Sequence, residues 1–261
     1  MARDGSQPND RGAGDRTTSS RSPGTLYVVG TPIGHPDDIT LRALATLRRV
    51  TVIASEDPRA TQALLTHHGI TATVTSYGPF QRLDKIRLLL HRLTQGQDVA
   101  LVSDNGTPVI YDPGSLFVAA AHQAGISIKV IPGPSIITAA PAISGFSGDT
   151  IIFEGHIPST SRRLGPYLSR LNKERRTLVF CVDPGALTGL LKILAQILPT
   201  RHIAIAMNLT TRDETLSRGL PGELLDQIGP VPKNSMVTVV IEGYRVGSQN
   251  YSSSRRRMTT R

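Results

Sequence analysis

The chain has 261 residues, of which 39% are apolar, so it can bury a substantial core either as two modest α/β domains or as one large one. Aromatic residues make up only 4% of the chain and Trp is absent, which excludes an aromatic base-stacking platform as the main recognition device. The single Cys181 excludes an intramolecular disulfide and fits a reducing, cytoplasmic setting, and the lack of any run of 18 apolar residues excludes a transmembrane helix.

The formal net charge of +9 is distributed unevenly. Residues 1–24 carry four Arg and three Asp, residues 245–261 carry five Arg and no acidic residue, and the chain between them has a net charge of only +3. We expect residues 1–24 to form a disordered tail and residues 245–261 a basic disordered tail. The basic tail can add phosphate attraction that is independent of nucleic-acid sequence.

Residues 25–145 are predicted to form an N-terminal α/β domain with a five-stranded, mainly parallel sheet, because short β-branched runs alternate with amphipathic helical stretches. After the first strand, LYVVG, Thr40 can cap a helix. The second strand, TVIAS, leads through Asp57 and Pro58 into a helix that Gly69 ends. TATVTS, VALVS and SIKVIPG are the remaining strands, with helices over LDKIRLLLHRL and PGSLFVAAAHQAG.

Residues 146–244 are predicted to form a C-terminal α/β domain with a mixed sheet, and the boundary is placed near residues 143–149. The expected strands are TIIFEG, TLVFCV, HIAIAM, TLSRG and MVTVVIEG, with helices near residues 164–171, 186–198 and 223–228. HIAIAM and TLSRG are expected to pair as a hairpin, which makes this sheet mixed.

Three segments that follow strands of the first domain are unusually rich in Gly and Pro. They are residues 30–38, 103–114 and 132–135. Ligands of open α/β sheets bind at the carboxyl ends of the parallel strands, and rigid, narrow turns let the backbone approach a ligand closely. We therefore expect these three loops to line a ligand site.

Several other kinds of site are disfavoured. No G-x-G-x-x-G leads into a helix and no G-x-x-x-x-G-K-[ST] is present, which argues against dinucleotide and nucleoside-triphosphate chemistry. No G-x-S-x-G is present either, which argues against a hydrolase. His67 and His68 are adjacent on a helix and are expected to point in different directions, so we predict surface histidines and no metal site.

Four segments resemble the tetrapyrrole methylase superfamily: LYVVGTPIGHPDDITLRAL, VIASEDPRAT, VALVSDNGTPVIYDPG and IPGPSIITAAPAISG. More narrowly, they are similar to its branch that methylates a cytidine ribose 2′-hydroxyl in 16S ribosomal RNA. The resemblance runs from about residue 26 to residue 243 and is weaker in the second half. It implies a homodimer of two-domain α/β subunits that binds S-adenosylmethionine between the domains without a metal ion. The implied partner is ribosomal RNA or the small ribosomal subunit.

By motif position, the resemblance implies cofactor contacts from both domains. From the first domain these are Pro32, Asn105, Gly106, Thr107, Ile110, Ser135 and Ile136, and from the second domain, across weaker sequence, Val182 and Leu209. Methyl transfer from a sulfonium needs in-line positioning of the nucleophile, so orientation supplies much of the catalysis. Backbone groups on rigid turns can hold the adenine and the methionine carboxylate of the cofactor without a dedicated catalytic side chain.

A ribose hydroxyl is a poor nucleophile, so a group must accept its proton or desolvate it. The candidate catalytic residues are Asp104, Asp57 and Asp38; Asp104 is preferred because it ends a buried strand beside the cofactor loop, whereas Asp57 is equally well explained as a helix cap. The candidate substrate-binding residues are Glu56, Arg59 and Asp112. Arg59 can hold a phosphate or pair with a neighbouring carboxylate, and Asp112 can be another cap.

The chain departs from the pattern of the RNA-methylating branch at residues 76–81, 181–186, 207–211 and 233–235, where several charged signatures are replaced. Two alternatives therefore stay open. One is a tetrapyrrole ring methylase of the corrin or sirohaem type, against which the TPIG and EDPR motifs argue. The other is a catalytically silent member of the family that binds RNA or the ribosome.

Overall fold

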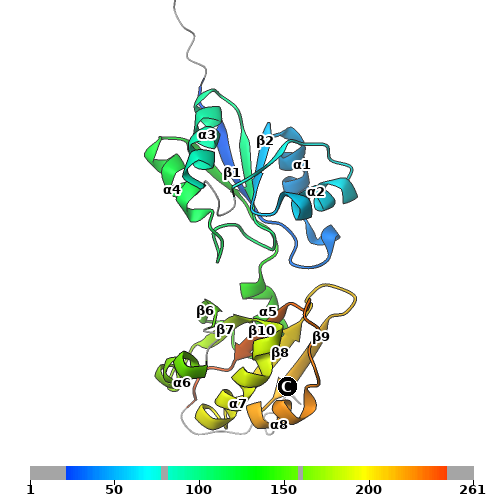
Figure 1. The fold of residues 1–261 in the computed structure, drawn as a ribbon, viewed down its shortest axis with the longest axis vertical. Helices are drawn as coiled ribbons and strands as arrows, with labels where there is room; N and C mark the ends of the chain where they lie inside the picture. The colour runs from blue at the N-terminus through cyan, green and yellow to red at the C-terminus, as the bar shows by residue number, and fades with distance from the viewer. Residues whose placement is uncertain (1–21, 78–81, 158–160, 246–261) are drawn as a thin grey trace, which may run out of the picture.

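The computed structural model describes residues 22–77, 82–157 and 161–245. Figure 1 shows two sheets with their helices, one above the other, with helix α5 (Ile136–Ser144) between them. Among the described residues, no helix combines the length and the apolar character needed to cross a bilayer.

The first sheet has five strands in the order β3-β2-β4-β1-β5. Every neighbouring pair is parallel, which confirms the predicted sheet. Its strands are β1 (Thr25–Val29), β2 (Val52–Ser55), β3 (Val74–Ser76), β4 (Val99–Val102) and β5 (Ser127–Ile131). Because β1 lies between β4 and β5, the loops that follow these three strands leave the same edge of the sheet side by side.

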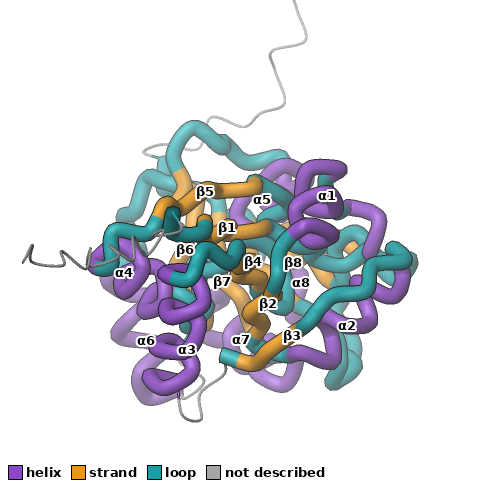
Figure 2. The backbone as a smooth tube through the Cα atoms, turned by 90° about the horizontal axis from the view of Figure 1, so that it is seen from above, coloured by secondary structure: helices purple, strands orange, loops and turns teal. Residues whose placement is uncertain are grey.

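Helices cover both faces of this sheet, as Figure 2 shows from above. On one face lie α1 (Leu41–Arg49) and α2 (Pro58–His67), and on the other lie α3 (Arg82–Thr94) and α4 (Ser115–Gln123). Strands β2 and β4 are buried at every position, which explains why Ser55 is their only polar residue. The predicted caps are confirmed: Thr40 Oγ1 accepts the Ala43 N–H, and Asp57 accepts those of Arg59 and Ala60.

The second sheet has the order β6-β7-β10-β8-β9 and is mixed, as predicted. Its strands are β6 (Ile151–His156), β7 (Thr177–Val182), β8 (Ile203–Met207), β9 (Thr215–Gly219) and β10 (Val237–Ile241). Only β6 and β7 pair in parallel, and the antiparallel pairing of β8 with β9 confirms the hairpin.

The helices of the second half are α6 (Ser161–Arg170), α7 (Leu187–Ile197) and α8 (Pro221–Gln227), which pack on one face of the second sheet. Helix α5 covers the other face, although its sequence follows β5 of the first sheet. Its Ala140 is buried there with Val179 and Val240, and Ile33 from the loop after β1 joins the same cluster. The loops of the first sheet are therefore anchored against the second.

The two predicted tails lie mostly outside the described residues, which begin at residue 22 and end at residue 245. Residues 78–81, which belong to the altered segment after β3, also lie outside the described residues. At the inner end of the first tail, Gly24 is buried and its N–H donates to the Leu93 carbonyl at 2.8 Å. At the inner end of the second, Arg245 pairs with Glu242 at 3.2 Å.

Candidate active site

A cavity of about 400 Å³ lies where the loops of the first sheet face the second sheet. This size falls within the range of roughly 300–1,000 Å³ that is typical of small-molecule sites. The first half of the chain contributes Ile33, Glu56, residues 103–107, residues 110–112, Ser135 and Ile136 to its lining, and the second half contributes Phe153, His156, residues 181–184 and residues 235–238.

The loops after β1 and β4 are joined by hydrogen bonds that converge on one carbonyl. The Gly106 carbonyl accepts the Thr31 N–H at 2.9 Å, the Thr31 hydroxyl at 3.2 Å and the Ser103 hydroxyl at 3.0 Å. The Gly106 N–H in turn donates to the Pro32 carbonyl at 3.3 Å. Gly106 has a φ of +81°, and an added Cβ would lie 3.2 Å from Ile33. The contact between the loops after β1 and β4 therefore requires glycine at this position.

The loop after β5 is held against the loop after β1 by direct backbone contact. The Gly30 N–H donates to the Ile131 carbonyl at 2.9 Å. A Cβ added to Gly30 would lie 2.8 Å from both N and Cα of Gly133. The two backbones therefore touch with no room for a side chain, and the three Gly/Pro-rich loops form one connected wall.

The loop after β4 has an unusual backbone conformation at two residues. Val109 has a φ of +77° and Tyr111 a φ of +56°, values that cost side-chain-bearing residues roughly 1–3 kcal/mol each. The Asp112 carboxylate holds this conformation, because Oδ1 accepts the Gly114 N–H at 2.6 Å and Oδ2 accepts the buried Tyr77 hydroxyl at 2.8 Å. Burial, and then the nearby Asp112 charge, raises the pKa of Tyr77, so its hydroxyl stays protonated.

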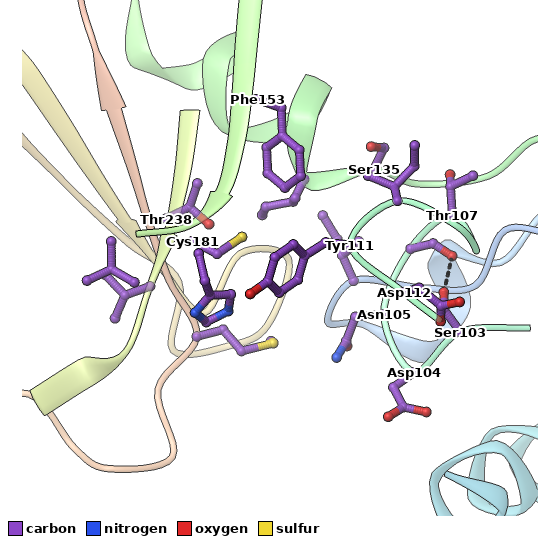
Figure 3. A pocket seen from close by; sticks show the side chains of 18 of the residues that line it. Ser103, Asp104, Asn105, Thr107, Tyr111, Asp112, Ser135, Phe153, Cys181 and Thr238 are labelled. Atoms are coloured by element: carbon purple, nitrogen blue, oxygen red, sulfur yellow. Dashed lines mark hydrogen bonds between the residues drawn. The ribbon is translucent and has the colours of Figure 1, made fainter. Parts of the chain in front are cut away.

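Tyr111 reaches across the cavity to the second sheet. Its ring stacks on His156, at the end of β6, with centroids 5.0 Å apart and planes 24° from parallel. Figure 3 shows the ring between Asn105 on one side and Cys181 on the other. An added Cβ at Gly155 would lie 2.6 Å from the Tyr111 ring, so the glycine makes room for this contact. Tyr111 thus links the two halves of the site.

The opposite wall comes from the ends of neighbouring strands in the second sheet. Val182 of β7 pairs with Val237 of β10, which places residues 181–184 beside residues 235–238. Phe153, Cys181 and Thr238 line this side in Figure 3. Burial raises the pKa of the Cys181 thiol, so it stays protonated and is a poor nucleophile.

The structure brings most of the predicted cofactor residues together. Asn105, Gly106, Thr107, Ile110, Ser135, Ile136 and Val182 all line the cavity. Pro32 instead lines a second cavity of about 320 Å³, which shares residues 103–105 with the first. Leu209 lies outside both, buried in the apolar cluster that contains Ile33.

The predicted polar residues are spread more widely. Asp104 lines both cavities, and its carboxylate accepts the Asp57 N–H at 2.9 Å. In Figure 3, Asp104 lies at the edge of the side chains that line the main cavity, away from Tyr111 and Cys181. Burial raises the pKa of the Asp104 carboxyl, and the hydrogen bond from Asp57 opposes that rise.

Glu56 and Asp112 also line the main cavity, whereas Asp57, Arg59 and Asp38 line neither cavity. The Asp57 carboxylate caps α2, and Arg59 is exposed in the first turn of that helix. Asp38 is exposed in the short 3₁₀ helix Pro36–Asp38. The loop of residues 103–114, which is predicted to line a ligand site, contains Tyr111, although Tyr111 itself is not singled out; Phe153 and His156 are missed as lining residues. Phe153 lies inside β6 and His156 ends it, so their only sequence signal is a place in or next to a predicted strand.

The expectation that His67 and His68 point apart is wrong. Their ring centroids are 4.8 Å apart in an edge-to-face arrangement. The physical reason is that α2 ends at His67, and His68 has non-helical dihedrals of −96° and 12°. The angular separation of successive helical residues therefore does not apply to this pair.

The chain matches the family of tetrapyrrole (corrin/porphyrin) methylases over residues 25–225. It is 39% identical over 222 residues to the ribosomal RNA small subunit methyltransferase I of Thermotoga maritima, an alignment that covers 84% of this chain and 99% of that relative. The protein of the same name from Escherichia coli O157:H7 is 36% identical over 237 residues, covering 89% of this chain and 82% of the relative.

Among solved structures, the uroporphyrin-III C-methyl transferase from Thermus thermophilus complexed with S-adenyl homocysteine has a similar fold. The TM-score is 0.58 at 19% sequence identity, with 84% of this chain and 97% of that chain covered. The family match spans most of the chain and includes all three loops that line the cavity. The chain therefore belongs to the tetrapyrrole methylase family.

Proposed function

We propose that this chain is an S-adenosylmethionine-dependent methyltransferase that methylates the 2′-hydroxyl of a cytidine in 16S ribosomal RNA. The observation that carries the proposal is the 39% identity along 99% of a relative named for small-subunit ribosomal RNA methylation. Identity to the solved uroporphyrin methylase is only 19%. An RNA substrate is therefore preferred to a tetrapyrrole ring.

The residues of the main cavity suit S-adenosylmethionine. Ile110, Ile136 and Phe153 offer apolar surface for an adenine ring, and Asn105, Thr107 and Ser135 offer polar groups for the ribose and the amino-acid end. Gly106 lets Ile33, Pro134 and Ser135 pack closely around the loop after β4, which keeps this wall of the cavity compact. The bound cofactor supplies an electrophilic methyl group, and the related uroporphyrin methylase was solved with S-adenyl homocysteine.

Asp104 is the best-placed residue to handle the hydroxyl proton. Its side chain lies where the two cavities meet, so a substrate group entering through the second cavity would meet it beside the cofactor cavity. Burial raises the pKa of its carboxyl, and a higher pKa makes a carboxylate a stronger general base. The hydrogen bond from the Asp57 backbone holds the carboxylate in place.

Glu56 and Arg59 are assigned to substrate contact. Glu56 lines the cofactor cavity beside Asp104, and exposed Arg59 follows it in the first turn of α2, where a guanidinium can hold a phosphate. Asp112 is assigned to shaping the loop rather than to contacting RNA, because its oxygens are engaged by Tyr77 and Gly114.

The proposed assembly is a homodimer that works in the cytoplasm on ribosomal RNA or the small subunit. The edge strand β5 supports an intermolecular contact, since Val130 is 61% exposed there. Nearby Leu41, the first residue of α1, is 85% exposed, and Arg42 of the same helix donates to the Val130 carbonyl. An exposed apolar edge of this kind is typical of an interface. Light scattering on the wild-type chain and on Val130→Asp tests the assembly.

The activity is tested with purified protein, radiolabelled S-adenosylmethionine, and either free 16S ribosomal RNA or small subunits. Ribose methylation is then mapped by mass spectrometry in the RNA and in a strain that lacks the protein. We expect label at one cytidine in vitro and loss of one ribose methyl group in the deletion strain. Methylation of a tetrapyrrole, or an unchanged RNA in the deletion strain, would overturn the proposal.

The role of Asp104 is tested with Asp104→Asn, which keeps the size of the side chain. General-base catalysis typically contributes a factor of about 10² to 10⁴, so kcat should fall by that order while the affinity for S-adenosylmethionine stays near wild type. Asp84→Asn, on the exposed surface of α3, is the matched control. Full activity of Asp104→Asn would remove this residue from the mechanism.

A further inference from the structure

We propose that Asp37, His67 and His68 form a binding site for a divalent transition-metal ion, with Zn²⁺ as the best-fitting ion. The site lies on the first sheet's side of the molecule, between the 3₁₀ helix Pro36–Asp38 and the end of α2. It is separate from the cofactor cavity, and the inference does not depend on the proposed activity.

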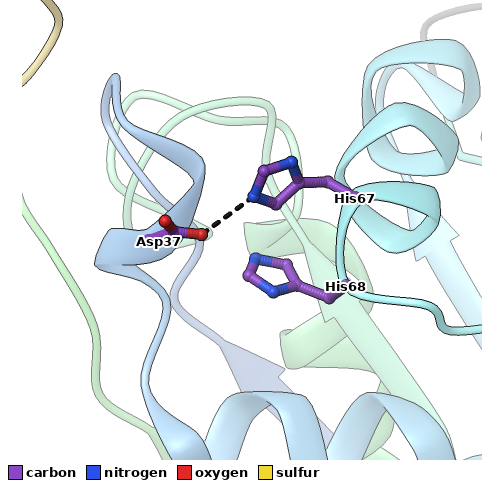
Figure 4. A group of neighbouring side chains, drawn as sticks. All are labelled: Asp37, His67 and His68. Carbon is purple, nitrogen blue, oxygen red and sulfur yellow. Dashed lines mark hydrogen bonds and ion pairs between the residues drawn. The ribbon is translucent and has the colours of Figure 1, made fainter.

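The three side chains already face a common point, as Figure 4 shows. One potential ligand atom from each lies within 4.8 Å of the other two, and among the described residues no other group of three His, Cys, Asp or Glu meets this geometry. His67 Nε2 lies 2.8 Å from Asp37 Oδ1. In tetrahedral zinc sites the ligands lie about 2.0–2.2 Å from the ion, hence roughly 3.4 Å from one another. Small side-chain rotations would therefore suffice.

The tautomers are compatible with coordination. His68 Nε2 lies 3.0 Å from the Pro36 carbonyl, an acceptor only, so Nε2 carries the proton in the metal-free chain. An ion bound through Nδ1 would leave this hydrogen bond in place, and an ion bound through Nε2 would displace the proton. This hydrogen bond is the kind of outer contact that fixes the ring of a metal-binding histidine. At His67, an ion would replace the proton that is shared with Asp37.

The donor set and its surroundings favour a transition metal. Two imidazoles and one carboxylate suit Zn²⁺ and similar first-row ions, whereas Mg²⁺ and Ca²⁺ prefer oxygen ligands alone. The two histidines lie at the carboxyl end of α2, where the helix dipole is negative and favours a cation. Asp37 and His67 are exposed, so solvent can supply the remaining ligand position.

Such an ion would tie two segments that are 30 residues apart in the chain. Residues 36–38 belong to the loop after β1, and His67 lines the second cavity, together with Pro36, Asp104 and Asn105. A bound ion would therefore fix one rim of that cavity and stabilise the folded chain by mass action.

The test uses the untagged full-length chain, stripped of metal with a chelator. We expect calorimetry to show one Zn²⁺ bound per chain, Co²⁺ to give a visible absorption band, and Zn²⁺ to raise the melting temperature. Asp37→Asn, His67→Ala and His68→Ala should each weaken Zn²⁺ binding by about tenfold or more. His122→Ala is the matched control, because His122 is also an exposed histidine in the last turn of a helix.

Circular dichroism of the metal-free variants separates loss of the site from loss of the fold. The inference is overturned if the folded wild-type chain binds no Zn²⁺ at micromolar concentrations. It is equally overturned if binding survives in both His67→Ala and His68→Ala but disappears in Cys181→Ser, which would place the ion at the cavity thiol instead.

Discussion

Replacing Gly30 with Ala tests whether direct backbone contact holds the loops of the cavity together. Gly30 follows β1, and its Cα faces the backbone of Gly133 in the loop after β5. Gly30 is not among the residues with positive φ, so alanine can adopt its backbone conformation. The substitution therefore adds one methyl group at the contact and no conformational strain.

The structure sets the size of the effect. The added Cβ would lie 2.8 Å from Gly133 N and Cα, which is 0.6 Å closer than the 3.4 Å at which ordinary contact begins. Both obstacles are backbone atoms, so no flexible side chain can move away. Overpacking of this kind costs about 1–3 kcal/mol. We expect that loss of stability, together with weaker binding of S-adenosylmethionine, because relief of the clash must separate the loops after β1 and β5.

Urea unfolding followed by circular dichroism measures the stability, and calorimetry measures the cofactor affinity. Gly189→Ala is the control: Gly189 is exposed within α7 with open space around it, so alanine should stabilise the chain by about 0.5–1 kcal/mol. If Gly30→Ala matches the wild type in both stability and affinity, the two backbones are not in tight contact and do not hold the loops together.

Three further substitutions test individual contacts. Thr31→Val removes a buried hydroxyl whose single proton lies within reach of two loop carbonyls, those of Ser103 and Gly106. Urea unfolding should show a loss of about 1 kcal/mol, and no loss would mean that the loops are held by other bonds. Tyr77→Phe removes the hydroxyl that binds Asp112 and should cost about 1.5–3 kcal/mol in urea unfolding at pH 7; an unchanged stability would mean that this hydrogen bond does not hold the loop. Hydrogen bonds from the Arg176 side chain lower the pKa of Glu174 from 4.5 to about 2, so this pair stabilises the fold above pH 4.5 and the contribution is lost as the pH falls towards 2. Glu174→Gln should therefore reduce the pH dependence of the urea midpoint between pH 4.5 and 2. If the midpoint of the variant falls with pH as steeply as that of the wild type, the pair of Glu174 and Arg176 does not stabilise the fold.

The sequence by itself determined the local elements of this protein. Apolar periodicity identified the strands and the helices, and Asp57 and Thr40 marked the helix starts because a side-chain oxygen satisfies N–H groups only a few residues away. The Gly/Pro-rich loops located most of the cavity wall on the first sheet. In each of these cases the signal lies within a few neighbouring residues, which is why a single sequence contains it.

The tertiary structure alone decided how these pieces meet. The order β3-β2-β4-β1-β5 makes the loops after β1, β4 and β5 neighbours, and α5 packs on the second sheet rather than on the first. The stacking of Tyr111 on His156 and the approach of Asp37 to His67 join residues that are far apart in the chain. Residues so distant are brought together by burial of apolar surface between whole elements, and no local pattern in the sequence records which elements share that surface.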